Sequence, residues 1–155
     1  MNITIERVIQ ATPEVHDLIG ELNAVLGAVY EAHQRHGLTF EQLFEPNVRF
    51  FLARLDGIAV GCGGVALFDD YAEVKRMYTR PAVRGLGLAK ALLRRIKDEA
   101  RAVGAPVLRL ETGIHQQDAI RLYESAGFRP CGPFGPYAMM PVNKIETSLF
   151  FEKRL

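Results

Sequence analysis

The sequence has few cysteines and almost no net charge, and both scarcities exclude classes of protein. Cys62 and Cys131 are too few for a disulfide framework and lack metal-ligand spacing, so we expect both to be buried free thiols. His16, His33 and His36 show no paired spacing with acids or cysteines, so no metal site is predicted. A net charge of +1 gives no support to nucleic acid or an anionic membrane as a partner.

Long apolar runs and a targeting segment are also missing. The longest apolar run, IAVGCGGVALF at 58–68, is too short to span a bilayer as a helix. The first residues, MNITIER, have no basic region followed by an apolar run, so no secretory signal is predicted and a cytoplasmic location is the default expectation. No repeat, low-complexity tract or linker interrupts the chain, which predicts a single domain over residues 1–155.

What the chain does contain is an ordered series of strand and helix signals. Strand-like segments are residues 2–8, 48–55, 58–68, 72–79, 106–111, 128–132 and 148–155. Helical spacing covers about 13–33, 38–44, 89–103 and 118–127, and 133–147 is expected to be a loop with three prolines. Asp56-Gly57 predicts a tight hairpin. An antiparallel meander followed by β-α-β-α-β predicts an α/β fold, a mixed sheet with a central parallel crossover.

The stretch RPAVRGLGLAKALL (80–93) presents a helix start without covering side chains. It contains no acid, and Gly85 and Gly87 let a ligand approach the backbone closely. A helix start offers unpaired N–H groups and a partial positive charge, so a phosphate or pyrophosphate is the logical occupant. The alternative is that the glycines only permit a tight turn, with Arg80 and Arg84 solvated.

Two other phosphate sites compete with this interpretation. The P-loop pattern GxxxxGK[ST] is absent. A dinucleotide fold, and with it an NAD(P)-binding oxidoreductase, fits the first two glycines of GLGLAK and an acid, Glu111, at the end of the next strand. Against it, Lys90 occupies the place of the third glycine, and the preceding strand ends an antiparallel meander.

RGLGLA resembles the R/Q-x-x-G-x-G/A pyrophosphate loop of the GNAT superfamily of N-acetyltransferases, with Arg84, Gly87 and Ala89 on its three defining positions. AEVKRMYTRPAVRGLGLAKALL (72–93) looks like the family's central strand, loop and helix, and AIRLYESAGF (119–128) looks like its second conserved helix. The resemblance covers nearly the whole chain. It implies a GNAT-like mixed sheet with helices on both faces, and acetyl-CoA or another acyl-CoA as co-substrate.

The resemblance also implies where the acyl donor binds. The donor's pyrophosphate is expected on the backbone N–H groups of Arg84, Gly85, Leu86, Gly87, Leu88 and Ala89. The pantetheine is expected along 76–79, with the N–H of Met77 or Tyr78 facing the thioester carbonyl and Thr79 close by. Many relatives carry a pantetheine-binding asparagine where this chain has HQQD, and we assign Gln116 to that contact.

Three charges in the central strand predict that part of it lines a wet cleft. A strand covered on both faces should be nearly apolar because an unpaired buried charge is costly, yet this strand carries Glu73, Lys75 and Arg76. Several family members place a glutamate general base where Glu73 lies, which implies that role here. Glu111, His115 and water remain alternative bases.

The resemblance assigns the tyrosine of RLYESAG, Tyr123, as the acid that protonates the departing thiolate. The same tyrosine also fits a simple core position, because it shares a helical face with Ala119, Leu122 and Ala126. No Ser-His-Asp or Cys-His context is present, so direct transfer without an acyl-enzyme is the simplest mechanism.

The predicted function is therefore acetyl transfer from acetyl-CoA to a primary amine of a small molecule or peptide. The acceptor groove is expected between the segment 31–48 and the loop 132–147, whose mixed chemistry leaves the acceptor open, as is the acyl chain preference. A non-catalytic acyl-CoA-binding or sensing module is the second hypothesis, and the oxidoreductase is the third. The last strand could also pair across a homodimer.

Overall fold

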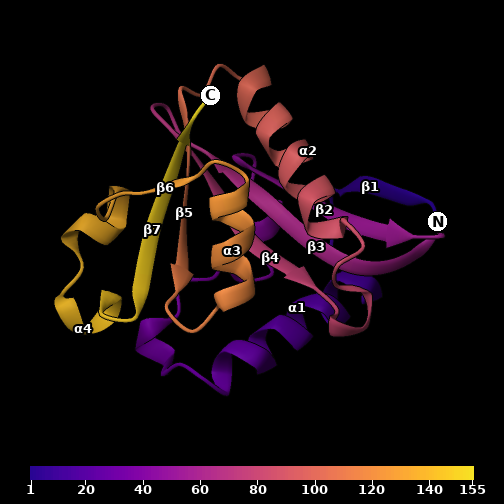
Figure 1. Cartoon of the computed structure of the whole chain (residues 1–155), viewed down its shortest axis with the longest axis horizontal. Helices are drawn as coiled ribbons and strands as arrows, with labels where there is room; N and C mark the ends of the chain where they lie inside the picture. Colours follow the sequence, from indigo (N-terminus) through magenta and orange to yellow (C-terminus); the bar gives the residue numbers. More distant parts are fainter.

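The computed structural model describes all 155 residues. Seven strands form one mixed sheet (Figure 1). The strands are β1 (Ile3–Val8), β2 (Val48–Leu55), β3 (Ile58–Leu67), β4 (Ala72–Thr79), β5 (Val107–Gly113), β6 (Arg129–Pro130) and β7 (Ser148–Arg154). They lie in the order β1-β2-β3-β4-β5-β7-β6, and every neighbouring pair is antiparallel except the parallel pair β4–β5. The predicted meander and central parallel crossover are confirmed.

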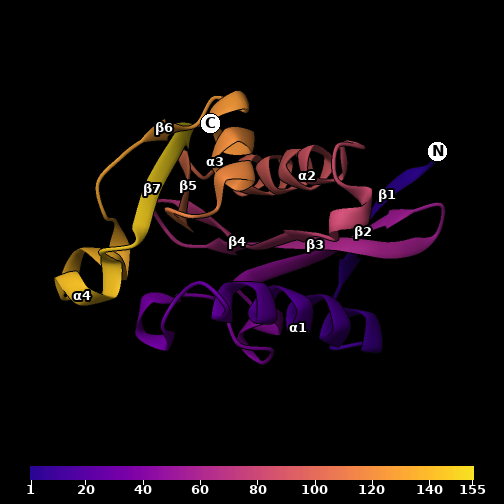
Figure 2. The ribbon, with the colours of Figure 1, turned by 60° about the horizontal axis from the view of Figure 1, so that its bottom comes forward.

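The helices cover both faces of the sheet, as expected. They are α1 (Pro13–Gly27), α2 (Leu88–Ala102), α3 (Gln117–Ser125) and the short α4 (Val142–Ile145). Four 3-10 turns are η1 (Ala32–Gln34), η2 (Gln42–Phe44), η3 (Pro81–Val83) and η4 (Gly135–Met139). Figure 2 shows α1 on one face and α2 and α3 on the other. No helix has both the length and the apolar character that crossing a membrane requires.

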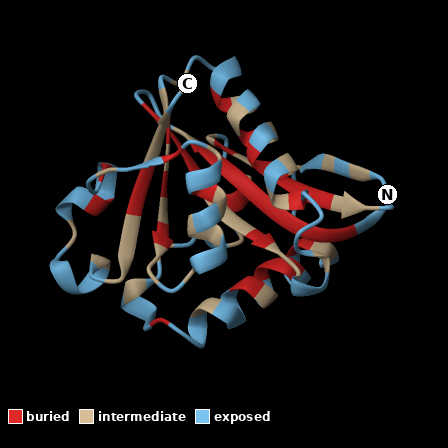
Figure 3. Cartoon of the chain, viewed as in Figure 1, coloured by how far each residue is buried: buried red, intermediate tan, exposed pale blue.

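A separate hydrophobic core lies on each face of the sheet. Leu92, Leu93 and Ile96 of α2 pack with Tyr123 on one face, whereas α1 contributes Val15, Leu18, Ile19 and Leu22 to the other. Figure 3 shows the buried residues running along the central strands and the sheet-facing sides of these helices. Because both faces are anchored, an opening at the centre of the sheet has rigid walls.

The first helix begins as predicted and ends earlier. The Thr12 hydroxyl caps it by accepting from Val15 N at 3.3 Å, and Pro13 is its first residue. The helix stops at Gly27, short of the predicted end at His33. Glycine is a poor helix former, and ending there frees the chain beyond it for the long-range contacts described below.

Two other predictions of local structure need correction. The helix expected over 38–44 is only the 3-10 turn Gln42–Phe44, although the capping box is real: Thr39 N donates to Gln42 Oε1 at 2.9 Å and Gln42 N donates to Thr39 Oγ1 at 3.3 Å. The loop expected over 133–147 contains η4 and α4. Proline is tolerated at a helix start, so the prolines there begin short turns.

The predicted hairpin turn is confirmed. Asp56 and Gly57 have φ angles of 49° and 87°, the left-handed pair that a two-residue hairpin requires.

The centre of the sheet is irregular in a way that positions the functional residues. Gly63 on β3 faces both Arg76 and Met77 on β4, which is a β-bulge with one extra residue. Arg76 accommodates the bulge with a φ of 55°, an uncommon conformation for a residue other than glycine. Beyond the bulge β4 no longer pairs with β5, since the parallel ladder includes only Ala72 and Glu73 of β4. The sheet is therefore open at its only parallel pair.

Candidate active site

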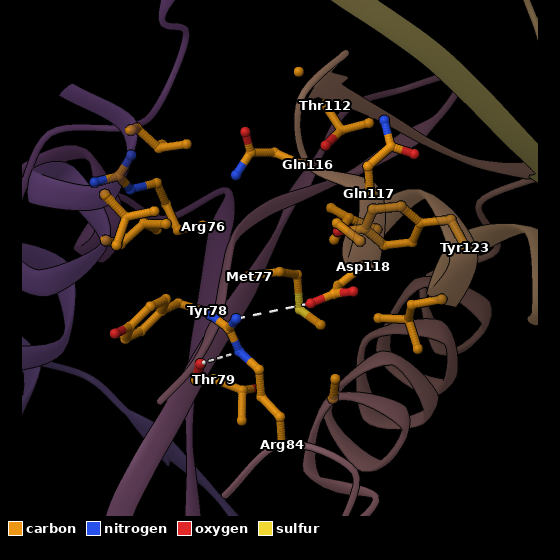
Figure 4. Close-up of a pocket in the computed structure, with 18 of the residues that line it drawn as sticks. Arg76, Met77, Tyr78, Thr79, Arg84, Thr112, Gln116, Gln117, Asp118 and Tyr123 are labelled. Carbon is orange, nitrogen blue, oxygen red and sulfur yellow. Dashed lines mark hydrogen bonds and ion pairs between the residues drawn. The ribbon is translucent and has the colours of Figure 1, made fainter. Parts of the chain in front are cut away.

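A cleft of about 940 Å³ lies where β4 and β5 separate (Figure 4). The residues predicted to bind the donor all line it: Met77, Tyr78, Thr79, Arg84, Gly85, Leu86, Gly87, Leu88, Ala89 and Gln116. Its walls also include Leu22, Val25, Leu26, Tyr30 and the segment 34–37 from the α1 face of the sheet. The cleft therefore passes through the sheet and connects its two faces.

The glycine loop leaves the start of α2 uncovered. Gly85 and Gly87 have φ angles of 82° and 93°, which glycine adopts without strain, and a Cβ added to either would meet no atom within 4 Å. Gly87 is the N-cap of α2, and no side chain caps the helix or places an acid in its first turn. The glycines thus make the tight turn and also leave the start of α2 accessible to a ligand.

The two arginines beside the loop have different partners. Arg80 makes a two-pronged contact with Glu21 of α1, with Nε 3.1 Å from Oε1 and Nη2 2.9 Å from Oε2. Arg84 remains at the cleft, where its Nε donates to the Thr79 carbonyl at 3.2 Å and its Nη1 lies 3.8 Å from Asp118 Oδ2 (Figure 4). The contact with Asp118 joins segments far apart in the sequence, and no local pattern signals it.

Tyr123 combines the core and cleft positions that the sequence left open. Its side chain is 5% exposed and packs against the Phe128 ring at 5.8 Å between centroids, yet it lines the cleft (Figure 4). Its hydroxyl makes no hydrogen bond within the chain and is not among the buried unpaired atoms, so it retains contact with the cleft. Burial, reinforced by the Glu111 carboxyl, raises the pKa of Tyr123, which keeps the phenol protonated at neutral pH.

Tyr30 joins the two faces across the cleft, and sequence reasoning missed it. Its hydroxyl donates to Gln116 Oε1 at 2.6 Å and accepts from His115 N at 2.9 Å. In the sequence Tyr30 belongs to the apolar stripe of a helix predicted to reach residue 33, and it only leaves that helix because α1 ends at Gly27. The bond to Tyr30 fixes the Gln116 carboxamide with its nitrogen free.

A second hollow of about 290 Å³ lies next to the cleft and shares His36, Gly37 and Lys75 with it. It is bordered by parts of 36–42 and 136–140, so the two segments expected to form an acceptor groove do lie together.

Glu73 lies in the wall of this hollow and not in that of the larger cleft. It is 4% exposed, and its Oε2 accepts from the Tyr137 hydroxyl at 2.7 Å and from Lys75 Nζ at 3.2 Å. Lys75 also donates to the His36 carbonyl at 3.1 Å. Glu73 is thus held by partners from β4 and from η4, with Oε1 making no hydrogen bond within the chain.

Glu111 is the carboxylate that lines the larger cleft, together with His115. It accepts from the Ser148 hydroxyl at 2.7 Å. Burial raises its pKa, and the nearby Glu73 carboxyl adds to this, against the lowering effects of the Ser148 hydrogen bond and of the neighbouring His36 and Lys75. The prediction that charged residues of β4 line a wet cleft is confirmed, because Lys75 and Arg76 both face it.

The cysteines are free thiols, with Cys62 buried and Cys131 half-buried. The Cys62 thiol donates to the carbonyl of Arg76 at 3.4 Å, and burial raises its pKa to about 12. A thiol so protonated is a poor nucleophile at neutral pH. No three His, Cys, Asp or Glu side chains converge in a way that could hold a metal ion.

Comparison with known proteins identifies the family. The model of the "Acetyltransferase (GNAT) family" matches residues 15–128. The chain is 45% identical, over 99% of both chains, to an "IAA acetyltransferase" of Azospirillum brasilense. An acyl-CoA N-acyltransferase structure from Klebsiella pneumoniae matches with a TM-score of 0.79 and 34% identity, over 99% of this chain and 97% of that one. An Elizabethkingia anophelis GNAT acetyltransferase with acetyl-CoA bound shares the fold at 21% identity and a TM-score of 0.70, over 99% of both chains.

A mixed sheet opened at its parallel pair, with an uncovered helix start beside the opening, defines an acyl-CoA-dependent acyltransferase. The chain belongs to the GNAT family of acetyltransferases, as the resemblance of its glycine loop indicated. This assignment sets aside the oxidoreductase alternative.

Replacing Gly87 with glutamate is expected to weaken CoA binding by at least about 100-fold, because it places bulk and negative charge where the pyrophosphate should approach. The matched control is Gly104→Glu at the other end of α2. Gly104 also has a positive φ, 78°, and equal free space, so both variants pay a similar cost of about 1–2 kcal/mol in backbone strain. Calorimetric titration with CoA measures the difference. Unchanged affinity in a folded Gly87→Glu protein would contradict the assignment of the loop.

Proposed function

We propose that the protein transfers an acetyl group from acetyl-CoA to a primary amine of a small molecule or peptide by direct attack. The observation that carries this proposal is the cleft through the sheet. It joins the uncovered start of α2 on one face to the hollow that contains Glu73 on the other, so donor and acceptor can meet without an acyl-enzyme. The high pKa of the Cys62 thiol supports the absence of such an intermediate.

The donor half of the cleft relies on backbone groups. The Arg84 N–H already donates to the Pro81 carbonyl at 3.3 Å, whereas the N–H groups from Gly85 to Ala89, with the positive end of α2, suit a pyrophosphate. Past the bulge, β4 has no partner on the β5 side, which leaves the backbone around Met77 and Tyr78 free to donate to a thioester carbonyl. Gln116 offers its free amide nitrogen to the pantetheine, since Tyr30 occupies its oxygen.

Glu73 is the proposed general base. A lysine-like amine has a pKa of about 10.4, so its neutral form is disfavoured by about 4–5 kcal/mol at pH 7 and the proton must be removed. Glu73 directs one oxygen to Tyr137 and Lys75 and keeps the other without a partner, which leaves one oxygen to accept a proton. Glu111, with its raised pKa and its position in the cleft, is the alternative carboxylate.

Tyr123 is the proposed general acid. Its hydroxyl has no partner within the chain, lies in the cleft and stays protonated because burial raises its pKa. A leaving thiolate with a pKa of about 8.5 needs only about 2 kcal/mol of assistance near neutral pH. The acid should therefore matter less than the base.

Acetyl-CoA with a panel of amines, amino acids and peptides is expected to release CoA thiol and give a product heavier by one acetyl group. Thiol detection and mass spectrometry of the product measure the two together. Tight acetyl-CoA binding without thiol release for any acceptor would favour the non-catalytic binding module instead.

Glu73→Gln keeps the shape of the side chain but cannot accept a proton, so kcat/KM is expected to fall by roughly 10²–10⁴. The deficit should shrink as the pH approaches the pKa of the amine, where the base is no longer needed. The matched control is Glu111→Gln, measured over the same pH range. A wild-type profile for Glu73→Gln together with a large loss for Glu111→Gln would move the role of base to Glu111.

Tyr123→Phe removes only the hydroxyl, so kcat is expected to fall about 10- to 100-fold while the affinity for acetyl-CoA barely changes. An acyl donor with a more acidic thiol should recover part of this loss, because a better leaving group depends less on the acid. Tyr71→Phe, which removes a phenol outside the cleft, controls for packing. Full turnover in a stable Tyr123→Phe protein would show that the hydroxyl has no catalytic role.

A further inference from the structure

Arg76 lines the cleft, but the proposed acetyl transfer gives this charged side chain no role. Apart from the hairpin residue Asp56, it is the only residue other than glycine with a positive φ. This conformation sends its side chain toward α1, and Figure 4 shows Arg76 and Met77 leaving β4 in different directions. The bulge therefore positions a guanidinium in the cleft on the face opposite α2.

The Arg76 guanidinium has no carboxylate partner. Its one hydrogen bond goes to the neutral Asn23 amide oxygen, and its Nε is buried without any partner. Arginines elsewhere in the chain, such as Arg54 and Arg109, do form ion pairs with glutamates. A buried unpaired donor on a cation is costly, and native structures rarely keep one without a reason.

A second guanidinium lies close by and adds to the positive charge. Arg35 is exposed at the mouth of the cleft, has no ion pair and contributes, after burial itself, to the lowered pKa of Arg76. The Arg76 guanidinium packs so tightly on Gly37 that a Cβ there would clash, whereas Arg35 Nη1 would lie 3.4 Å from a Cβ on Gly27 at the end of α1. Two like charges without a counterion form a site that favours an anion.

The position of the two arginines indicates that this anion belongs to the acceptor and not to CoA. The glycine loop and Met77 lie with α2, whereas Arg76 points to α1 and lies beside His36 and Gly37, which also line the hollow of Glu73. A planar guanidinium matches a carboxylate through two parallel hydrogen bonds.

We propose that Arg76 and Arg35 form a carboxylate-binding subsite in the acceptor half of the cleft, so that the acceptor is an amine that also carries a carboxylate. This inference rests on the proposed acetyl transfer and specifies its substrate class. The apolar residues Leu22, Val25 and Leu26 line the same side of the cleft and suit an acceptor with an apolar body, such as a hydrophobic amino acid.

The test compares acceptors that share a phenyl ring and a primary amine and differ at the position of the carboxylate: phenylalanine, phenylalaninamide and phenethylamine. For the wild-type enzyme, kcat/KM is expected to be about 10- to 100-fold higher for the amino acid than for either neutral analogue, because a charge-assisted bidentate contact is lost. An aminophosphonate analogue of phenylalanine forms a fourth arm. A clear preference for the phosphonate would overturn the carboxylate assignment in favour of a phosphoryl group.

Variants connect this preference to the two arginines. Arg76→Gln should reduce the ratio of kcat/KM for amino acid to amide about tenfold or more, mainly by raising KM for the amino acid, and Arg35→Gln should reduce it less. Arg101→Gln, an exposed arginine on α2 without an ion pair, is the matched control and should leave the ratio unchanged.

Equal kcat/KM values for amino acid and amide in the wild-type enzyme would overturn the subsite while leaving acetyl transfer intact. Failure of every acceptor to release CoA thiol would overturn both the subsite and the proposed acetyl transfer. Because the wild-type comparison needs no substitution, the inference stays testable even where a variant at the bulge fails to fold.

Discussion

The active site depends on the early end of pairing between β4 and β5. Two residue pairs hold this parallel ladder, which ends at Glu73, and the bulge at Arg76 follows in the part of β4 that no longer pairs with β5. Gly63 lies opposite the bulge, and the Met77 side chain occupies the space that a Cβ on Gly63 would take. Helices packed on both faces keep the resulting gap open by holding each half of the sheet in place. Without the gap there would be no passage for a thioester to reach an acceptor from the opposite face.

The two halves of the cleft offer different chemistry, and the proposed reaction uses this difference. The proposed donor side presents main-chain N–H groups and a helix dipole, which depend on the backbone conformation of Gly85 and Gly87 and little on neighbouring side chains. The proposed acceptor side presents the side chains of Arg76, Lys75 and Glu73. In this proposal the backbone half binds the donor, and the side-chain half sets the choice of acceptor.

Local patterns predicted the elements that depend on neighbouring residues. The Asp56-Gly57 hairpin, the Thr12 cap and the glycine loop each follow from a few adjacent residues, and the structure contains them. The antiparallel meander and the central crossover followed from standard rules of connection, whereas the place of β7 between β5 and β6 was not predicted.

The rest of the site depends on contacts between distant segments. Tyr30 reaches Gln116 only because α1 ends early, and Arg80 lies beside Glu21 only once the sheet has formed. The bulge that directs Arg76 forms opposite Gly63, which lies on another strand. Contacts between distant segments leave no pattern in neighbouring residues. The sequence therefore showed that β4 carries charged side chains, but not which residues contact them.

Direct transfer across the open sheet is tested most directly by initial velocities over a matrix of acetyl-CoA and acceptor concentrations. A cleft that holds both substrates at once predicts a ternary complex, so double-reciprocal plots should give lines that intersect. Parallel lines would indicate that the acetyl group first moves to the protein and that CoA leaves before the acceptor binds, which would contradict the account.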